Sequence, residues 1–299
     1  MDRNITSFTK AALLRFIVAC IALATTGANA AEFARVDKDS SGRPRALQIA
    51  TRSYTPAEPG GGYTVDLIGA VHIADRRYYK QLNEHFQRYD ALLFELVIAD
   101  AAAAAQSAET GHSLLSRLQI DMKDALGLAF QLEEIDYGAA NFVHADFSAD
   151  MLWQSMEERG ESLYVYFWRL FYAAIADYAR DPLGLQSLQL LTQLATESDD
   201  DAFKIAIAYE LVKAAQAGDI LGSDQGSAII VARNEHALAV LQEQIAAGAK
   251  RIGIFYGAAH MVDFDERLRR ELKLTAVGEE WTDAWLFGET VSSREAAAN

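Results

Sequence analysis

The sequence contains one short phrase twice, and each copy follows a run of β-forming residues. Residues 68–75 read I-G-A-V-H-I-A-D, and residues 256–263 read Y-G-A-A-H-M-V-D. Aligned on glycine, each copy gives G-A-x-H, an apolar residue, one further residue and Asp, and a helical pattern follows. Glycine at a strand end allows a sharp turn without a Cβ clash, so the next side chains project from the carboxyl edge of a sheet, where open α/β folds bind ligands. His72 and His260 are therefore predicted to converge on one metal or catalytic site.

A structural interpretation of the repeated phrase stands beside the functional one. A single histidine at a strand end is a weak signal, because such residues are often hydrogen-bonded in a core. The two histidines could belong to a duplicated turn and only fasten the start of a helix, but this does not explain why both turns carry histidine. Asp75 and Asp263 are expected to be helix N-caps.

The flanking patterns predict an α/β fold with a mixed central sheet and parallel β-α-β units at both ends of the chain. Strands are expected at Arg43–Tyr54, Tyr63–Ile68 and Ala91–Val97, with a helix between the second and the third. A helical crossover joins parallel strands, so the second and third strands are expected to be parallel neighbours. In the second half, a helix over Gly226–Gly248 precedes a strand over Arg251–Tyr256.

These elements predict a single α/β domain over residues 31–290, with a helical insertion at about 113–218 and a flexible tail over 291–299. The insertion shows helical spacing over Leu115–Glu134, Ser148–Arg159, Glu161–Arg180, Leu183–Glu197 and Asp200–Gly218, and a final extended segment is expected over Leu274–Phe287. Asn141–Asp146 is short and mixed, which indicates an edge strand or an active-site loop, and leaves His144 without an assigned role. Tyr164–Tyr172 holds six aromatic residues in nine. It is expected to be a core helix, with an apolar substrate wall or a membrane-facing patch as alternatives.

The first thirty residues have the pattern of a secretory signal peptide. A basic start precedes an apolar run over Phe16–Ala24, and residues 28–30 (A-N-A) match a cleavage site. The apolar run is too short to span a membrane. We therefore expect cleavage near Ala30, a periplasmic or secreted protein, and no stable membrane insertion. Cleavage would remove Cys20, the one cysteine in the sequence, and with it any disulfide or thiolate chemistry.

The charge of the chain excludes one class of partner. The formal net charge is −15 at pH 7. Nucleic-acid binding depends on phosphate contacts from Lys and Arg, so nucleic acid is not an expected partner.

Glu95, Arg233 and Asn234 are the other candidate site residues. Glu95 lies within the apolar run L-L-F-E-L-V, where an ionised carboxylate is costly unless it is paired or binds a cation. It is expected beside His72 as a metal ligand or general base, or alternatively in a salt bridge with a buried Arg233. Arg233 and Asn234 lie in the predicted helix Gly226–Gly248, where a buried Arg could hold a carboxylate or an oxyanion. A solvated helix charge is the alternative for Arg233.

The ordered set Gly69–His72, Glu95, Arg233-Asn234 and Gly257–His260 resembles the TraB/GumN and Tiki family, part of a superfamily with erythromycin-esterase-like and ChaN-like proteins. The resemblance covers about residues 64–97 and 226–273. It implies an α/β core with a variable helical insertion and a site made from these motifs. Tiki members are metal-dependent peptidases that clip an amino-terminal segment from a secreted signalling protein, and TraB-type members are linked to shutting down peptide pheromones. ChaN-like members bind haem, and the esterase-like branch opens a macrolide lactone.

The residues and the resemblance together predict a metal-dependent hydrolase, with peptides or a small molecule as substrate. His72 and His260 would bind a divalent ion (Mn, Co or Zn), and Glu95 would be a third ligand or a general base. Arg233 and Asn234 would hold the substrate carbonyl or carboxylate. Two alternatives stay open: a metal-free, esterase-like hydrolase with histidine as base, and a haem or hydrophobic-ligand binding protein whose pocket wall is the aromatic segment.

Overall fold

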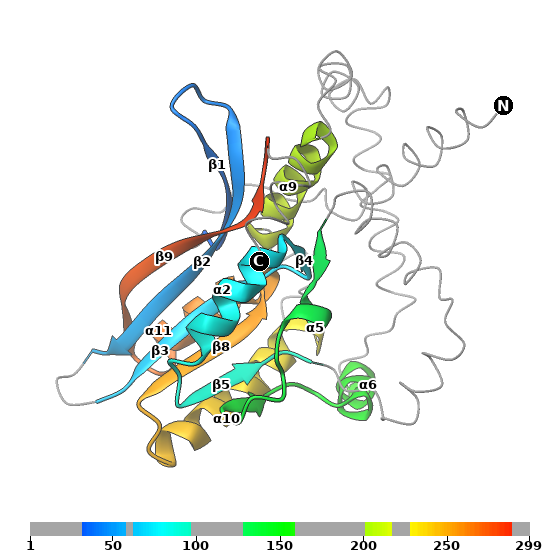
Figure 1. Cartoon of the computed structure of the whole chain (residues 1–299). Coiled ribbons are helices and arrows are strands. Elements are labelled where there is room, and N and C mark those ends of the chain that lie inside the picture. Colours follow the sequence, from blue (N-terminus) through cyan, green and yellow to red (C-terminus); the bar gives the residue numbers. More distant parts are fainter. Residues whose placement is uncertain (1–31, 58–61, 97–127, 159–200, 217–227, 289–299) are drawn as a thin grey trace.

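The computed structural model describes residues 32–57, 62–96, 128–158, 201–216 and 228–288, and it confirms the predicted α/β fold (Figure 1). A mixed sheet has the strand order β1-β2-β3-β8-β5-β7, and β9 also pairs with β2. The strands are β1 (Ala34–Lys38), β2 (Pro44–Pro56), β3 (Thr64–Ala70), β5 (Ala91–Phe94), β7 (Phe142–His144), β8 (Arg251–Gly257) and β9 (Leu274–Leu286). A separate antiparallel pair joins β4 (Ile73–Ala74) to β6 (Ala129–Phe130).

Helices cover both faces of the sheet. They are α2 (Arg76–Phe86), α5 (Gln131–Glu134), α6 (Ala149–Glu158), α9 (Asp201–Gln216), α10 (Arg233–Ala246) and α11 (Met261–Arg270). A π-helical turn, η1 (Ala228–Ala232), leads into α10, and a 3₁₀ turn, η2 (Ala258–His260), leads into α11. Buried side chains of α2 and α9 belong to one apolar cluster, and those of α10 and α11 belong to a second. Neighbouring strand residues divide between the two clusters (Leu67 and Ile68, Ile254 and Phe255), as the two-residue period of a strand requires.

The strand order differs from the predicted one between β3 and β5, the strands that lead to His72 and Glu95. β3, β8, β5 and β7 are mutually parallel, so their carboxyl ends share one edge. However, β8 lies between β3 and β5, so the expectation that these two strands are neighbours is wrong. The β-α-β unit is parallel as predicted, but a strand from the second half of the chain is inserted into it. His260, which follows β8, is therefore carried by the strand next to that of Glu95.

Several element boundaries also differ from the predicted ones. β5 ends at Phe94, so Glu95 follows the strand rather than lying inside it. The predicted helix Leu115–Glu134 falls outside the described residues up to position 127, and its described end contains β6 and the four-residue α5. The helices predicted from Ser148 and Asp200 are confirmed as α6 and α9, and Asn141–Asp146 contains the edge strand β7.

Other predicted segments lie outside the described residues. These are the signal peptide (1–30), the predicted helices at 161–180 and 183–197 with their aromatic run, and the tail (291–299). In the described ranges, no helix combines the length and the apolarity that a membrane crossing needs.

Gly253 in β8 lies directly under buried side chains of the two neighbouring strands, β5 and β3. A Cβ at this position would lie 2.5 Å from Leu92 Cδ1 and 3.1 Å from Ile68 Cδ1. We expect Gly253→Ala to lower the free energy of unfolding by about 1–3 kcal/mol, the usual cost of overpacking a core. Urea unfolding monitored by circular dichroism measures this change.

Gly278→Ala in β9 is the matched control. Its Cβ would meet nothing closer than Ser53 Cβ at 4.0 Å, so its effect should stay within about 0.5 kcal/mol. Equal stability of the two variants would contradict the close contact of Gly253 with the Leu92 and Ile68 side chains.

Candidate functional site

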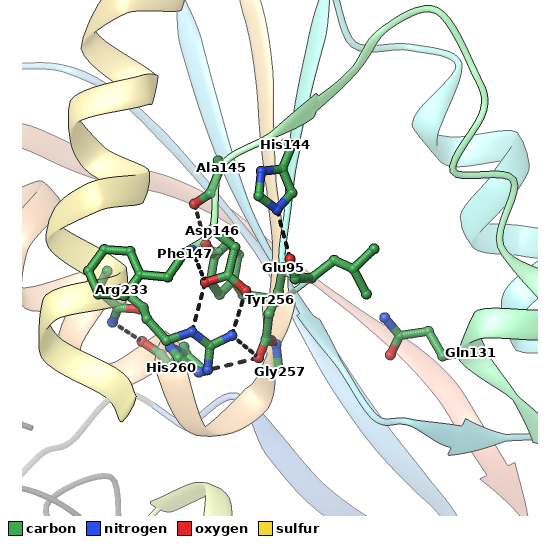
Figure 2. Close-up of polar contacts among 12 residues, drawn as sticks. Glu95, Gln131, His144, Ala145, Asp146, Phe147, Arg233, Tyr256, Gly257 and His260 are labelled. Atoms are coloured by element: carbon green, nitrogen blue, oxygen red, sulfur yellow. Dashed lines mark hydrogen bonds and ion pairs between the residues drawn. The ribbon is translucent and has the colours of Figure 1, made fainter. Parts of the chain in front are cut away.

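The candidate site lies at the carboxyl edge of the parallel strands, where Figure 2 shows its polar side chains turned toward one another. Glu95 follows β5, and Asp146 comes two residues after β7. His260 ends the 3₁₀ turn after β8. Arg233, the first residue of α10, reaches this edge from the helix that covers it. Residues from four separate segments thus meet at one point.

A buried guanidinium joins two carboxylates at the centre of the site. Arg233 Nε donates to Asp146 Oδ1 at 2.7 Å, and Arg233 Nη2 donates to Asp146 Oδ2 and to Glu95 Oε1, each at 2.7 Å. The side chains of Arg233, Asp146 and Glu95 are 8%, 0% and 15% exposed. Burial acts to lower the pKa of Arg233, but the Asp146 hydrogen bond and the Glu95 charge outweigh it and raise that pKa. Two carboxylates share one guanidinium, so the three groups carry one excess negative charge.

Glu95 is held in its ionised form. Its second oxygen, Oε2, accepts the Gly257 N–H at 2.6 Å. Burial acts to raise the pKa of Glu95, but its Coulombic interactions with His260 and Arg233, together with the Gly257 hydrogen bond, lower it to about 2. A carboxylate with so low a pKa is a weak base near neutral pH. This electrostatic setting favours a role for Glu95 in holding a cation over the alternative role of general base.

The hydrogen bonds of Asn234 determine the tautomer of His260. Asn234 Nδ2 donates to the His260 carbonyl at 3.1 Å and to Asp263 Oδ2 at 2.8 Å, which leaves Asn234 Oδ1 as an acceptor. That oxygen lies 2.6 Å from His260 Nδ1, so Nδ1 carries a proton. Burial is the main cause that lowers the pKa of His260, to about 4. Near neutral pH the ring is therefore uncharged, and Nε2 has a free lone pair.

The lone pair of His260 faces the carboxylate of Glu95. His260 Nε2 and Glu95 Oε1 are 3.6 Å apart, and with the ring neutral both atoms are acceptors. Two ligands bound to one tetrahedral zinc ion at 2.0–2.2 Å would lie about 3.4 Å apart. The spacing, the free lone pair and the excess negative charge all fit a cation between these two atoms.

His72 lies at the exposed rim of the same edge. It follows β3 and is exposed to solvent, and its carbonyl accepts the Gln131 N–H at 2.9 Å. A Coulombic contribution from His72 is the last and smallest of the causes that determine the lowered pKa of Glu95, so His72 lies within electrostatic range of that carboxylate. In the parts of the chain that the structure describes, no three His, Cys, Asp or Glu side chains are grouped tightly enough to bind one ion. The site therefore supplies two preformed ligand atoms, with His72 at a distance from them.

The two copies of the repeated phrase are not equivalent in structure. Gly69 pairs with Tyr256 and Ala70 with Gly257, so the copies are one residue out of register. The first copy continues through β4 before α2 begins at Arg76, whereas the second enters η2 directly after Gly257. In these different settings His260 is buried, whereas His72 is exposed.

The glycines of the phrase allow neighbouring atoms to pack closely against the backbone, rather than allowing a sharp turn. Neither Gly69 nor Gly257 has a positive φ. A Cβ at Gly69 would lie 2.8 Å from Ile49 Cγ2, and one at Gly257 would lie 3.2 Å from Glu95 Oε2. The expected turn function is therefore wrong, and Gly257 instead allows the Glu95 carboxylate to reach the backbone.

The aspartates of the phrase also differ from their expected role as helix caps. Asp75 occupies the N-cap position of α2, but its carboxylate accepts the Leu286 N–H at 2.6 Å and pairs with Lys204 at 3.4 Å. Asp263 lies inside the first turn of α11 and accepts hydrogen bonds from Asn234 and Arg267, both at 2.8 Å. Both residues anchor their segment to another part of the fold.

Asp146 is the main site residue that the sequence analysis missed. It closes the mixed segment Asn141–Asp146, whose available signal was an acidic residue directly after a short strand. Tyr256 was also missed, and its hydroxyl donates to the Ala145 carbonyl. His144 lies beside these residues and its Nε2 is 2.7 Å from the Leu96 carbonyl, so it ties β7 to the segment after Glu95.

No family model, curated protein or solved structure matches this chain. The resemblance to the TraB/GumN and Tiki family stays a prediction.

The buried neutral state of His260 predicts a pH-dependent stability in the metal-free protein. The pKa of His260 is about 4 in the folded protein, below its ordinary value of 6.5, so the unfolded chain takes up a proton that the folded protein excludes. The free energy of unfolding should therefore fall as the pH drops from 6.5 toward 4.5, by at most about 1.4 kcal/mol per pH unit from this proton.

His260→Asn is the comparison variant, because asparagine can keep the donor to Asn234 Oδ1 without titrating. Urea unfolding at several pH values should give a flatter profile for this variant than for the parent protein. Parallel profiles over this pH range would show that His260 is not held neutral by burial.

Proposed function

We propose that this protein is a metal-dependent hydrolase with peptides as its substrate class. The observation that carries this proposal is the pair of opposed acceptors, His260 Nε2 and Glu95 Oε1, 3.6 Å apart in a cluster with one excess negative charge. An uncompensated negative charge is costly in a buried setting, and a divalent cation would offset it. His260, Glu95 and the exposed His72 would hold Mn, Co or Zn, and such an ion supplies the Lewis acidity that activates water for attack on a carbonyl.

In this proposal Arg233 and Asn234 are positioning residues rather than substrate-binding ones. Arg233 Nε and Nη2 are engaged with Asp146 and Glu95, so the guanidinium fixes the orientation of the Glu95 carboxylate. Asn234 holds the Nδ1–H tautomer of His260, which directs the Nε2 lone pair toward Glu95. Partners of this kind commonly tune a metal ligand.

The metal-free alternative is less well supported by the electrostatics. A general base works best with a pKa near the operating pH. The pKa values of His260 and Glu95 are lowered, by burial in the first case and by neighbouring charges and a hydrogen bond in the second, to about 4 and about 2. The peptide substrate class rests on the resemblance to the TraB/GumN and Tiki family, and secretion rests on the predicted signal peptide.

The proposal is tested by the substitution Glu95→Gln. Since Asp146 keeps two hydrogen bonds to Arg233, the guanidinium stays paired and the fold should be retained. We expect the affinity for Mn, Co or Zn, measured by isothermal titration calorimetry, to fall at least about 100-fold, beyond the 10–100-fold typical of an outer-shell change. Cleavage of a mixture of synthetic peptides by the metal-loaded protein, followed by mass spectrometry, should be lost as well.

Asp146→Asn is the matched control, because it removes a carboxylate from the same guanidinium but leaves both proposed ligand atoms. Breaking a buried ion pair costs about 3–5 kcal/mol, so this variant should be the less stable of the two. Because it removes the excess negative charge but no ligand atom, its loss of metal affinity should stay within the 10–100-fold typical of an outer-shell change. The metal-site proposal fails if Glu95→Gln binds the ion as tightly as the parent protein.

A further inference from the structure

One buried polar atom close to the site has no hydrogen-bond partner among the described residues. Gln131, the first residue of α5, is 6% exposed, and its Nε2 donates to the Tyr137 hydroxyl at 2.8 Å. Its Oε1 is fully buried, and no hydrogen bond within the described part of the chain reaches it. Native proteins leave few buried acceptors unpaired, because the desolvation of such an atom is not repaid. An unpaired acceptor beside a candidate site indicates a position where a ligand donor binds.

The backbone of Gln131 ties it to the segment that carries His72. Its N–H donates to the His72 carbonyl at 2.9 Å. The preceding residue, Phe130, pairs with Ile73 in the short β4–β6 ladder. Gln131 is therefore fixed directly against the first copy of the repeated phrase.

The side chains of Gln131 and Tyr137 are directed toward the Glu95 side of the site. Figure 2 shows the carboxamide of Gln131 pointing toward the segment that carries Glu95. The Tyr137 ring packs on Phe94, with centroids 5.3 Å apart, one residue before Glu95. Burial is the main cause of the raised pKa of Tyr137, and the charge of Glu95 adds to it, so the phenol lies within electrostatic range of the proposed metal ligand.

The pair presents one hydrogen-bond acceptor and one donor. The Tyr137 oxygen accepts from Gln131, so the phenol proton is directed elsewhere, while Gln131 Oε1 accepts nothing within the described residues. Rotating the carboxamide by half a turn would exchange the two roles and again leave one donor and one acceptor. A secondary amide has the complementary set, an N–H and a C=O, whereas an ester lacks the donor.

We propose that Gln131 and Tyr137 form a subsite that binds a peptide group of the substrate beside the proposed metal ligands. Gln131 Oε1 accepts the amide N–H, and the Tyr137 hydroxyl donates to the amide C=O. This assignment deepens the hydrolase proposal and rests on it, because it selects amides over esters as the substrate class. It is tested by binding, without turnover.

The experiment compares two small probes of the same shape, N-methylpropanamide and methyl propanoate, of which only the first carries an N–H donor. Protein labelled with ¹⁵N-glutamine reports on the Gln131 side-chain amide by NMR titration. We expect the amide probe to shift this resonance in a saturable way and to bind about tenfold more tightly than the ester, the scale of one hydrogen bond with its buried partner. Equal affinity of the two probes, or an unshifted Gln131 resonance, would overturn the proposal.

Variants then assign the contact to the two side chains. Gln131→Met should remove the preference for the amide probe, now measured by the shifts of backbone amides, and Tyr137→Phe should weaken amide binding several-fold. Gln154→Met is the matched control, since Gln154 is exposed on α6 and bonds only within its helix to Glu158 among the described contacts. A Gln131→Met protein that keeps the preference would also refute the subsite. If that variant does not fold, the two-probe comparison in the parent protein decides alone.

Two outcomes separate this inference from the hydrolase proposal. Amide selectivity without cleavage of any peptide by the metal-loaded protein would keep the subsite and refute the hydrolase. Peptide cleavage without amide selectivity at Gln131 would refute the subsite and keep the hydrolase proposal. A crystal structure with an ordered water on Gln131 Oε1 that the amide probe does not displace would show that the acceptor is satisfied by solvent, and would overturn the subsite.

Discussion

The geometry of the site depends on the buried guanidinium of Arg233. It makes three hydrogen bonds of 2.7 Å to the carboxylates of Asp146 and Glu95, which come from the ends of β7 and β5. Burying ions is costly unless their hydrogen bonds are complete, so each group restricts the other two to one arrangement. Since Arg233 begins α10, these bonds also fix the start of that helix at the sheet edge. His260 and the Gly257 N–H, on the central strand β8, meet the carboxylate that Arg233 has oriented.

A second buried charge pair anchors the other copy of the repeated phrase. Lys204 of α9 lies 3.4 Å from Asp75 and donates to the Leu286 carbonyl at 2.9 Å. The Trp285 indole donates to the Ile73 carbonyl at 2.7 Å. The segment after His72 is thus attached to β9 and to a helix of the insertion, whereas the segment after His260 is attached to α10 and α11. The aspartate in the last position of the phrase makes the anchoring contact in both copies, although its partners are unrelated.

The electrostatics of the site fit a cation better than they fit proton transfer. Ionised Glu95 and neutral His260 both have pKa values far below neutrality, and both present acceptor atoms to the same space. Such an arrangement is unfavourable for the metal-free protein, and it would be stabilised by an ion bound between the two atoms. Gln131 Oε1 is likewise a buried acceptor without a partner among the described residues, and a ligand could supply the missing donor.

The sequence by itself determined that two strands end close to the histidines of the repeated phrase and that the buried charge of Glu95 needs a partner. Local periodicity gave the α/β class, the strand-end positions of His72 and His260, and the pairing of Glu95 with Arg233 as an open alternative, because these depend on neighbouring residues. Only the tertiary structure decided that β8 separates β3 from β5, that Asp146 shares the guanidinium, and that His260 is buried while His72 is exposed. These features are set by contacts between residues that are far apart in the sequence, such as Ile68 and Phe255 or Asp146 and Arg233, and no local pattern encodes them.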